Sequence, residues 1–103
     1  MSKETYIKIM HNKDRLLVFT DENMKARGMV SWVLTNSPEN MVRDDIWSIP
    51  QEDKDGQWIF IDRLVSDEQY PIRTNMLGLM KYFKQKYPDK KVIWHSRGKA
   101  LHN

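Results

Sequence analysis

The sequence predicts an α+β domain built on a small mixed sheet, with three antiparallel strands followed by a strand, helix and strand crossover. Short β-prone runs come first along the chain. Residues 57–97 then contain an apolar run, a segment with apolar residues at spacings of three and four, and a second apolar run. A chain of 103 residues, 40% of them hydrophobic, fits a single domain covering residues 1–103.

Three antiparallel strands are predicted in the first third of the chain. Residues 6–10 contain alternating apolar residues, and residues 16–19 are apolar, which together predict a hairpin around a polar turn at residues 12–14. Residues 29–34 are strongly β-prone and predict the third strand.

A short helix and a loop are predicted to follow these strands. Ser37 has the character of an N-cap, and Pro38 takes the first helical position, so we expect a helix that runs to about Trp47. Residues 50–56 are rich in charged and turn-forming residues and predict a surface loop.

The second half predicts a crossover. Residues 57–66 form the most apolar run and indicate a central strand buried on both faces. Pro71 opens an amphipathic helix, which Pro88 ends, and residues 91–96 form a parallel strand. We expect the chain beyond this strand to be an exposed, frayed terminus. The strand at residues 92–96 would then have an open edge, which a homo-oligomer or an added strand would cover.

Charge is distributed unevenly along the chain. Residues 41–70 carry three Lys or Arg and eight Asp or Glu, for a net −5, whereas residues 81–103 carry seven Lys or Arg and one Asp, for a net +6. The basic segment predicts a surface for an acidic or phosphate-bearing partner, and a solvated face without a partner is the alternative. The predicted partner-binding residues are Lys84, Lys90, Lys91, Arg97 and Lys99.

The composition also bears on the location of the protein in the cell and on metal binding. No apolar run is long enough to span a bilayer, no signal peptide is recognisable, and there is no cysteine, so we expect a cytoplasmic protein that is not inserted in a membrane. His11, His95 and His102 have no paired ligand spacing, so no metal site is predicted.

Several short motifs follow one another in a familiar order. They are a strand with Ser31 and Trp32, a polar segment at residues 34–40, the Trp-Ile-Phe-Ile-Asp strand at residues 58–62, and a helix that ends over residues 82–88. This order resembles the core of the GNAT acetyltransferase superfamily, and most closely the toxin-activating lysine acyltransferases of RTX toxins, in a truncated and degenerate form. The resemblance covers about residues 16–97.

The resemblance implies an acyl donor, either acyl-CoA or acyl carrier protein, and assigns a catalytic role to Asp62. A GNAT enzyme cradles the coenzyme A pyrophosphate with a glycine-rich loop before the helix, whereas this chain has no glycine there. Arg73, Thr74 and Asn75 are the candidate donor-binding residues at that position. The catalytic histidine of the toxin-activating family has no counterpart, because His11 does not match the motif.

Three hypotheses about function therefore stand. The first is a degenerate GNAT-like domain that binds a protein partner in a structural or regulatory role, and the short, cysteine-free, methionine-rich chain suits a phage. The second is a minimal acyltransferase in which Asp62 acts as general base or orienting group. The third is a nucleic-acid-binding module that uses the C-terminal basic face, with Tyr82 as an aromatic contact.

Overall fold

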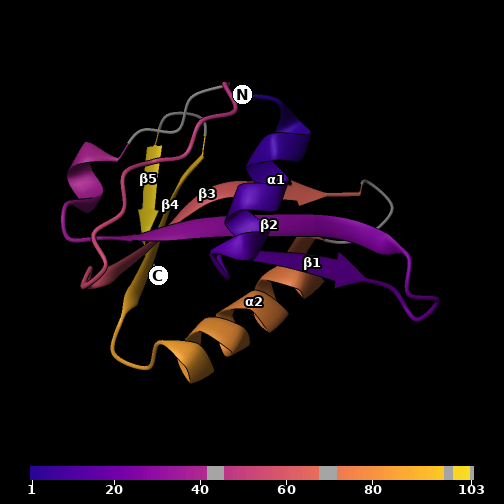
Figure 1. Ribbon diagram of the computed structural model, residues 1–103. Helices are drawn as coiled ribbons and strands as arrows, with labels where there is room; N and C mark the ends of the chain where they lie inside the picture. Colours follow the sequence, from indigo (N-terminus) through magenta and orange to yellow (C-terminus); the bar gives the residue numbers. More distant parts are fainter. Residues whose placement is uncertain (42–45, 68–71, 97–98, 103) are drawn as a thin grey trace.

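The computed structural model of the protein describes residues 1–41, 46–67, 72–96 and 99–102, with side chains left out at residues 72–75, 95–96 and 99–102. Its elements are shown in Figure 1. In chain order they are α1 (Lys3–Asn12), β1 (Leu16–Thr20), β2 (Ala26–Thr35), the 3-10 turn η1 (Pro38–Asn40), β3 (Trp58–Ser66), α2 (Ile72–Lys86), β4 (Lys91–Ser96) and β5 (Lys99–His102).

The strands form one mixed sheet in the order β1-β2-β3-β4-β5. β1, β2 and β3 pair antiparallel, β3 and β4 pair parallel, and β5 returns antiparallel to β4. Because β3 and β4 are parallel, they need a crossover connection, and α2 supplies it. The α+β class, the mixed sheet and the strand, helix and strand crossover are confirmed.

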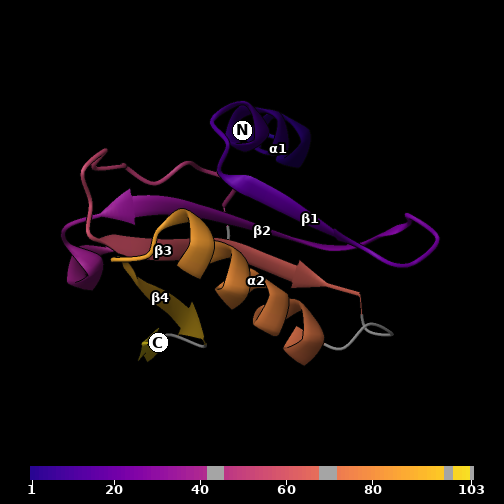
Figure 2. The same cartoon turned by 90° about the horizontal axis from the view of Figure 1, so that it is seen from below.

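The two helices cover opposite faces of the sheet, as Figure 2 shows with α1 on one side and α2 on the other. Side chains alternate along the strands, so each strand contributes to both layers. The layer under α2 includes Trp32, Ile61, Leu79 and Phe83. The layer under α1 includes Tyr6, Met10, Val33 and Phe60. The prediction of burial on both faces is confirmed for residues 59–63, whereas Val65 near the end of the strand is exposed.

Residues 6–10 belong to α1, so the prediction of a strand there is wrong. Ser2 caps this helix, because its hydroxyl accepts a hydrogen bond from the backbone N–H of Thr5 at 3.1 Å. Tyr6 and Met10 lie one helical turn apart and are both fully buried against the sheet. Lys8 is exposed and stands between Ile7 and Ile9, and this apolar, polar, apolar order produced the false strand pattern. The third antiparallel strand is β3 instead.

Two further predictions are corrected. The helix expected from Ser37 to Trp47 is limited to the three residues of η1, residues 42–45 lie outside the described residues, and residues 46–49 are not helical. The C-terminal segment, expected to be frayed, contributes β5, which pairs with β4. β4 is therefore an interior strand, and the open edge expected at residues 92–96 is absent from the described sheet.

The charged loop at residues 50–56 covers the edge of β2 beyond the end of β1. The Leu34 N–H donates to the Glu52 carboxylate at 2.8 Å, and the Leu34 carbonyl accepts from the Asp53 N–H at 2.9 Å. Gly56 comes so close to β2 that a Cβ there would lie 2.3 Å from the backbone nitrogen of Thr35. These contacts provide partners for backbone groups that β1 does not reach.

Candidate functional site

Asp62, the predicted catalytic residue, occupies a bulge in β3. Ser31 pairs with Arg63 and Trp32 pairs with Ile61, so Asp62 is an extra residue with no counterpart in β2. The bulge interrupts the alternation of the strand. As a result, Asp62 and Arg63 both turn their side chains to the α1 face, where each is less than a tenth exposed.

Asp62 takes part in a buried hydrogen-bonded group with Tyr6 and Ser31, which we call the Tyr6 cluster. The Tyr6 hydroxyl donates to the Asp62 carboxylate and lies 2.6 Å from the Ser31 hydroxyl. Burial raises the pKa of the Tyr6 phenol well above its ordinary value of 10.0, and the hydrogen bond to Asp62 raises that pKa further. The phenol is therefore a stable donor to Asp62 at neutral pH.

Arg63 balances the charge beside this cluster. Its guanidinium donates to the backbone carbonyl of Ile46, and its Cζ lies 4.6 Å from the centre of the Trp47 ring. The Trp47 ring also packs on Tyr6, with ring centres 5.0 Å apart. Trp47 is thus half-buried and lies over the Tyr6 cluster.

The geometry makes the Tyr6 cluster an internal support between α1, β2 and β3. Asp62 is 4% exposed, and its carboxylate accepts a hydrogen bond from a neighbouring side chain in the core. A general base has to reach the proton of a bound substrate, and the cluster is instead covered by α1 and Trp47. A catalytic role for Asp62 stays a prediction from the resemblance.

The candidate donor-binding residues Arg73, Thr74 and Asn75 lie in the first turn of α2. Their backbone continues directly into the helix, and their side chains fall outside the described residues. Donor binding at these positions stays a prediction.

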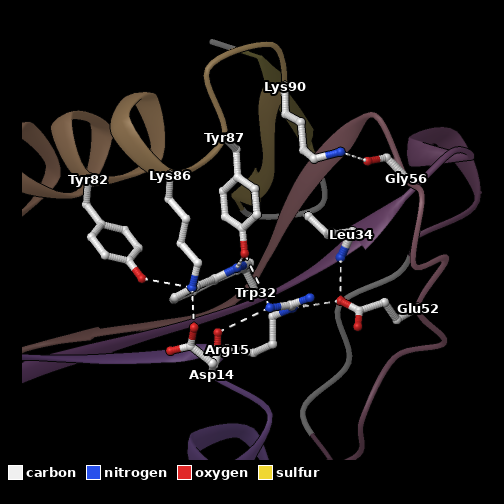
Figure 3. Close-up of polar contacts among 10 residues, drawn as sticks. All are labelled: Asp14, Arg15, Trp32, Leu34, Glu52, Gly56, Tyr82, Lys86, Tyr87 and Lys90. Atoms are coloured by element: carbon white, nitrogen blue, oxygen red, sulfur yellow. Dashed lines mark hydrogen bonds and ion pairs between the residues drawn. The ribbon is translucent and has the colours of Figure 1, made fainter.

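A second polar group joins α2 to the start of β1, as Figure 3 shows. The Tyr87 hydroxyl accepts hydrogen bonds from Trp32 Nε1 and from Arg15 Nη1, both at 3.3 Å. Arg15 Nε forms an ion pair with Glu52 at 3.0 Å, and Lys86 forms one with Asp14. These contacts fix the C-terminal end of α2 on the sheet.

The opposite side of α2 borders an open groove of about 640 Å³. Its floor is apolar, because Phe83 and Val92 are almost fully buried there and the ring of Tyr87 lies beside them. Its walls carry Leu77, Gly78, Met80, Pro88 and three lysines, Lys81, Lys84 and Lys90. We call this feature the α2 groove.

The structure brings together part of the predicted basic surface. Lys84 and Lys90 line the α2 groove, whereas Lys91 lies over the Trp58 ring at 5.7 Å and does not line the groove. Arg97 and the side chain of Lys99 lie outside the described residues. Lys81 and the exposed Leu77 were missing from the predicted set, although helical spacing places both near Lys84.

The described parts of the chain show neither a metal-binding cluster nor a membrane-spanning helix. They contain no group of three His, Cys, Asp or Glu residues that could hold a metal ion. None of the helices described has the length and apolar character needed to cross a membrane.

The chain was compared with known proteins. No protein-family model matches it, and neither a curated protein nor a solved structure is significantly similar to it.

Proposed function

We propose that this protein is a binding domain that holds an acidic, amphipathic helical segment of a partner protein in the α2 groove. The observation that carries the proposal is the combination of an apolar floor with three lysines along one groove. Amphipathic helices bind to such grooves through their apolar face, and their polar face stays at the rim.

The charges of the groove favour an acidic partner. Lys81 and Lys84 are exposed, and neither has a carboxylate within ion-pair distance among the described residues, in contrast to Lys86, which pairs with Asp14. Lys90 donates to the backbone carbonyl of Gly56, so its positive charge is not neutralised by that contact. Three uncompensated positive charges along one groove attract a negatively charged segment and fix its orientation.

The apolar surface favours a protein over a nucleic acid. Leu77 is 69% exposed on the groove wall, next to Gly78 and Met80. Single-stranded nucleic acids bind by stacking their bases on exposed aromatic rings. Tyr87 is the more exposed of the two aromatic side chains that line the groove, and its hydroxyl accepts hydrogen bonds from Trp32 and Arg15.

The resemblance noted above adds a candidate of the right chemistry, since acyl carrier protein would enter as an acidic partner. We propose binding rather than acyl transfer, because the buried position of Asp62 offers no support for a reacting group. Within this proposal the domain has a structural or regulatory role in the cytoplasm, and a phage is one candidate source.

The test uses a labelled synthetic helix with leucine along one face and glutamate along the other, and it follows binding by fluorescence anisotropy. We expect binding that weakens with salt, since exposed charges are screened. Lys81→Glu combined with Lys84→Glu should weaken the affinity about tenfold or more, which corresponds to roughly 1.4 kcal/mol. The matched control is Lys8→Glu, an exposed lysine on α1, which should leave the affinity unchanged.

Two further probes separate the alternatives. A peptide of the same composition but without an apolar face should bind much more weakly. Equal binding of the two peptides would show that the groove binds through its charge alone. A single-stranded DNA oligonucleotide that binds more tightly than the helix, with loss of binding in the lysine variant, would support the nucleic-acid module instead. Absence of binding by the amphipathic helix would refute the proposal.

A further inference from the structure

β1 is an edge strand whose sequence lacks the usual protection against pairing. It pairs with β2 on one side, and no other described strand lies on its other side. Natural edge strands are commonly interrupted by lysine, proline or an inward-pointing charge. The five residues of β1, Leu-Leu-Val-Phe-Thr, include none of these.

The outward-facing backbone groups of β1 follow from its pairing with β2. The Arg15 carbonyl accepts a hydrogen bond from the Trp32 N–H at 3.1 Å, so Arg15 faces β2. Because the direction alternates along an antiparallel strand, Leu16 and Val18 turn their N–H and C=O groups away from β2. The register shifts between Phe19 and Thr20, but the Asp21 N–H donates to the Lys25 carbonyl at 3.0 Å, so Thr20 before it also turns away. These three residues are spaced symmetrically about Val18.

From this pattern we propose that the protein forms a two-fold symmetric homodimer in which β1 pairs antiparallel with β1 of a second copy, centred on Val18. In this register Val18 faces Val18 of the second copy, and Leu16 faces Thr20. Every outward-facing N–H and C=O of the strand then meets a partner. A second copy provides this match automatically, because a two-fold interface is self-complementary.

The residues around β1 also favour a second copy of this chain as the pairing partner. Val18 is 51% exposed on the α1 face, beside Met29 of β2, so pairing would remove its apolar side chain from water. Just beyond the strand, the two-fold register places Arg15 opposite Asp21 of the second copy, so no like charges face each other there. Within each copy these two residues keep their own ion-pair partners, Glu52 and Arg27. The interface is small, so we expect a weak dimer whose population depends on concentration.

This dimer is independent of the proposed function. The α2 groove includes Val92 of β4, whereas the contact between α2 and the β1 side runs through Lys86 and Asp14. Pairing through β1 would leave both grooves of the dimer open, so the failure of either proposal would not affect the other.

The experiment uses the absence of cysteine from the chain. Val18→Cys should form an intermolecular disulfide under mild oxidation, because residues directly opposite in an antiparallel pair have Cα atoms about 5.5 Å apart, within disulfide range. Thr20→Cys, also exposed, is the matched control, since its two copies would lie roughly 13 Å apart along the paired strands. Equal cross-linking of both variants, or none at position 18, would overturn the proposed register.

Sedimentation equilibrium supplies an independent measurement. The wild-type mass should rise with concentration from 12.4 kDa towards twice that value. Val18→Lys should abolish the rise, whereas Val65→Lys, an equally exposed position on β3 away from the edge, should retain it. A wild-type protein that stays monomeric at all concentrations would exclude the dimer.

Discussion

The face of the sheet under α2 is covered by apolar and aromatic side chains, whereas the face under α1 carries the buried polar ones. Trp32, Leu79 and Phe83 pack together under α2, with the Trp32 and Phe83 ring centres 5.0 Å apart. The α1 face includes Asp62 and Arg63, both nearly fully buried. Burial of a charge is costly unless it is paired and hydrogen-bonded, so the two faces depend on different interactions.

The difference shows why the two layers should respond differently to change. The α2 face is stabilised by contact area, which is non-directional and scales with the apolar surface removed from water. The α1 face depends on specific partners, because the Tyr6 hydroxyl donates to Asp62 and also contacts the Ser31 hydroxyl. Loss of one partner there leaves a buried polar group unsatisfied.

The largest effect is expected on the α2 face. Phe83→Ala removes a 2% exposed ring from the core and should reduce the free energy of unfolding by about 3–5 kcal/mol. This is a large part of the ~5–15 kcal/mol typical of a whole domain. Urea unfolding followed by tryptophan fluorescence measures the loss. Leu77→Ala, on the exposed side of the same helix, should change stability by less than about 0.5 kcal/mol, and equal losses would contradict the assigned core.

A smaller loss is expected on the α1 face from Tyr6→Phe. The substitution keeps the ring but removes the hydroxyl that donates to Asp62 and contacts Ser31. The free energy of unfolding should fall by about 1–3 kcal/mol, the cost of leaving buried polar groups unsatisfied. Urea unfolding at neutral pH measures it. A neutral or stabilising outcome would show that the Tyr6 cluster does not support the fold.

Alkaline pH should test the same cluster through its titration. The pKa of Tyr6 is raised in the folded state, mainly by burial and then by the bond to Asp62, so folding favours the protonated phenol. This contribution is complete below the ordinary pKa of 10.0 and is lost as pH rises above it, by roughly 1.4 kcal/mol per pH unit. Unfolding free energies measured from pH 9 upward should fall less steeply for Tyr6→Phe than for wild type. Urea unfolding at each pH measures the two slopes, and equal slopes would contradict the assigned titration of Tyr6.

The two faces also differ in how well the sequence predicts them. The apolar spacing of α2 and the run in β3 come from local periodicity, so the crossover and its core could be predicted. On the α1 face, Tyr6 and Met10 fit both a period of two and a helical turn, and the Ser2 cap was the signal that would have separated them.

The sequence predicts the features of the candidate site that depend on neighbouring residues along the chain, but it does not predict the contacts between distant segments. Asp62 was identified as a strand residue, but its partner Tyr6 lies 56 positions away and is brought to it by the packing of α1 on the sheet, which is a tertiary contact. The lysines of the basic segment could be identified from the sequence as an excess of positive charge. The groove that organises them needs Val92 of β4 beside α2, which is a property of the tertiary fold.

A modest gain in stability is expected on the outer side of α2. Gly78 is exposed, and a Cβ at this position would meet no other atom within 4 Å. Gly78→Ala should raise the free energy of unfolding by about 0.5–1 kcal/mol, because glycine is a poor helix former. Thermal unfolding measures the gain. Binding of the amphipathic helix to the same variant shows whether the partner approaches the backbone at Gly78, and a destabilised variant would contradict the open placement.

The smallest effect is expected from the ion pair at the rim of the α2 face, which contrasts with the buried carboxylate of the α1 face. The Lys86 ammonium lowers the pKa of Asp14, mainly through their hydrogen bond, but the Asp14 side chain is 76% exposed. Solvent screens such a pair, so Asp14→Asn should cost less than about 1 kcal/mol. Because the folded-state pKa is lowered, this contribution is present above the ordinary carboxyl pKa of 3.8 and is lost as pH falls below it.

Urea unfolding of wild type and Asp14→Asn at low and high salt measures the contribution of the ion pair. The difference should shrink with salt, whereas the loss caused by Tyr6→Phe should not, since its partners are buried. Equal salt sensitivity of the two variants would remove the distinction between a solvated contact at the rim and a buried network under α1.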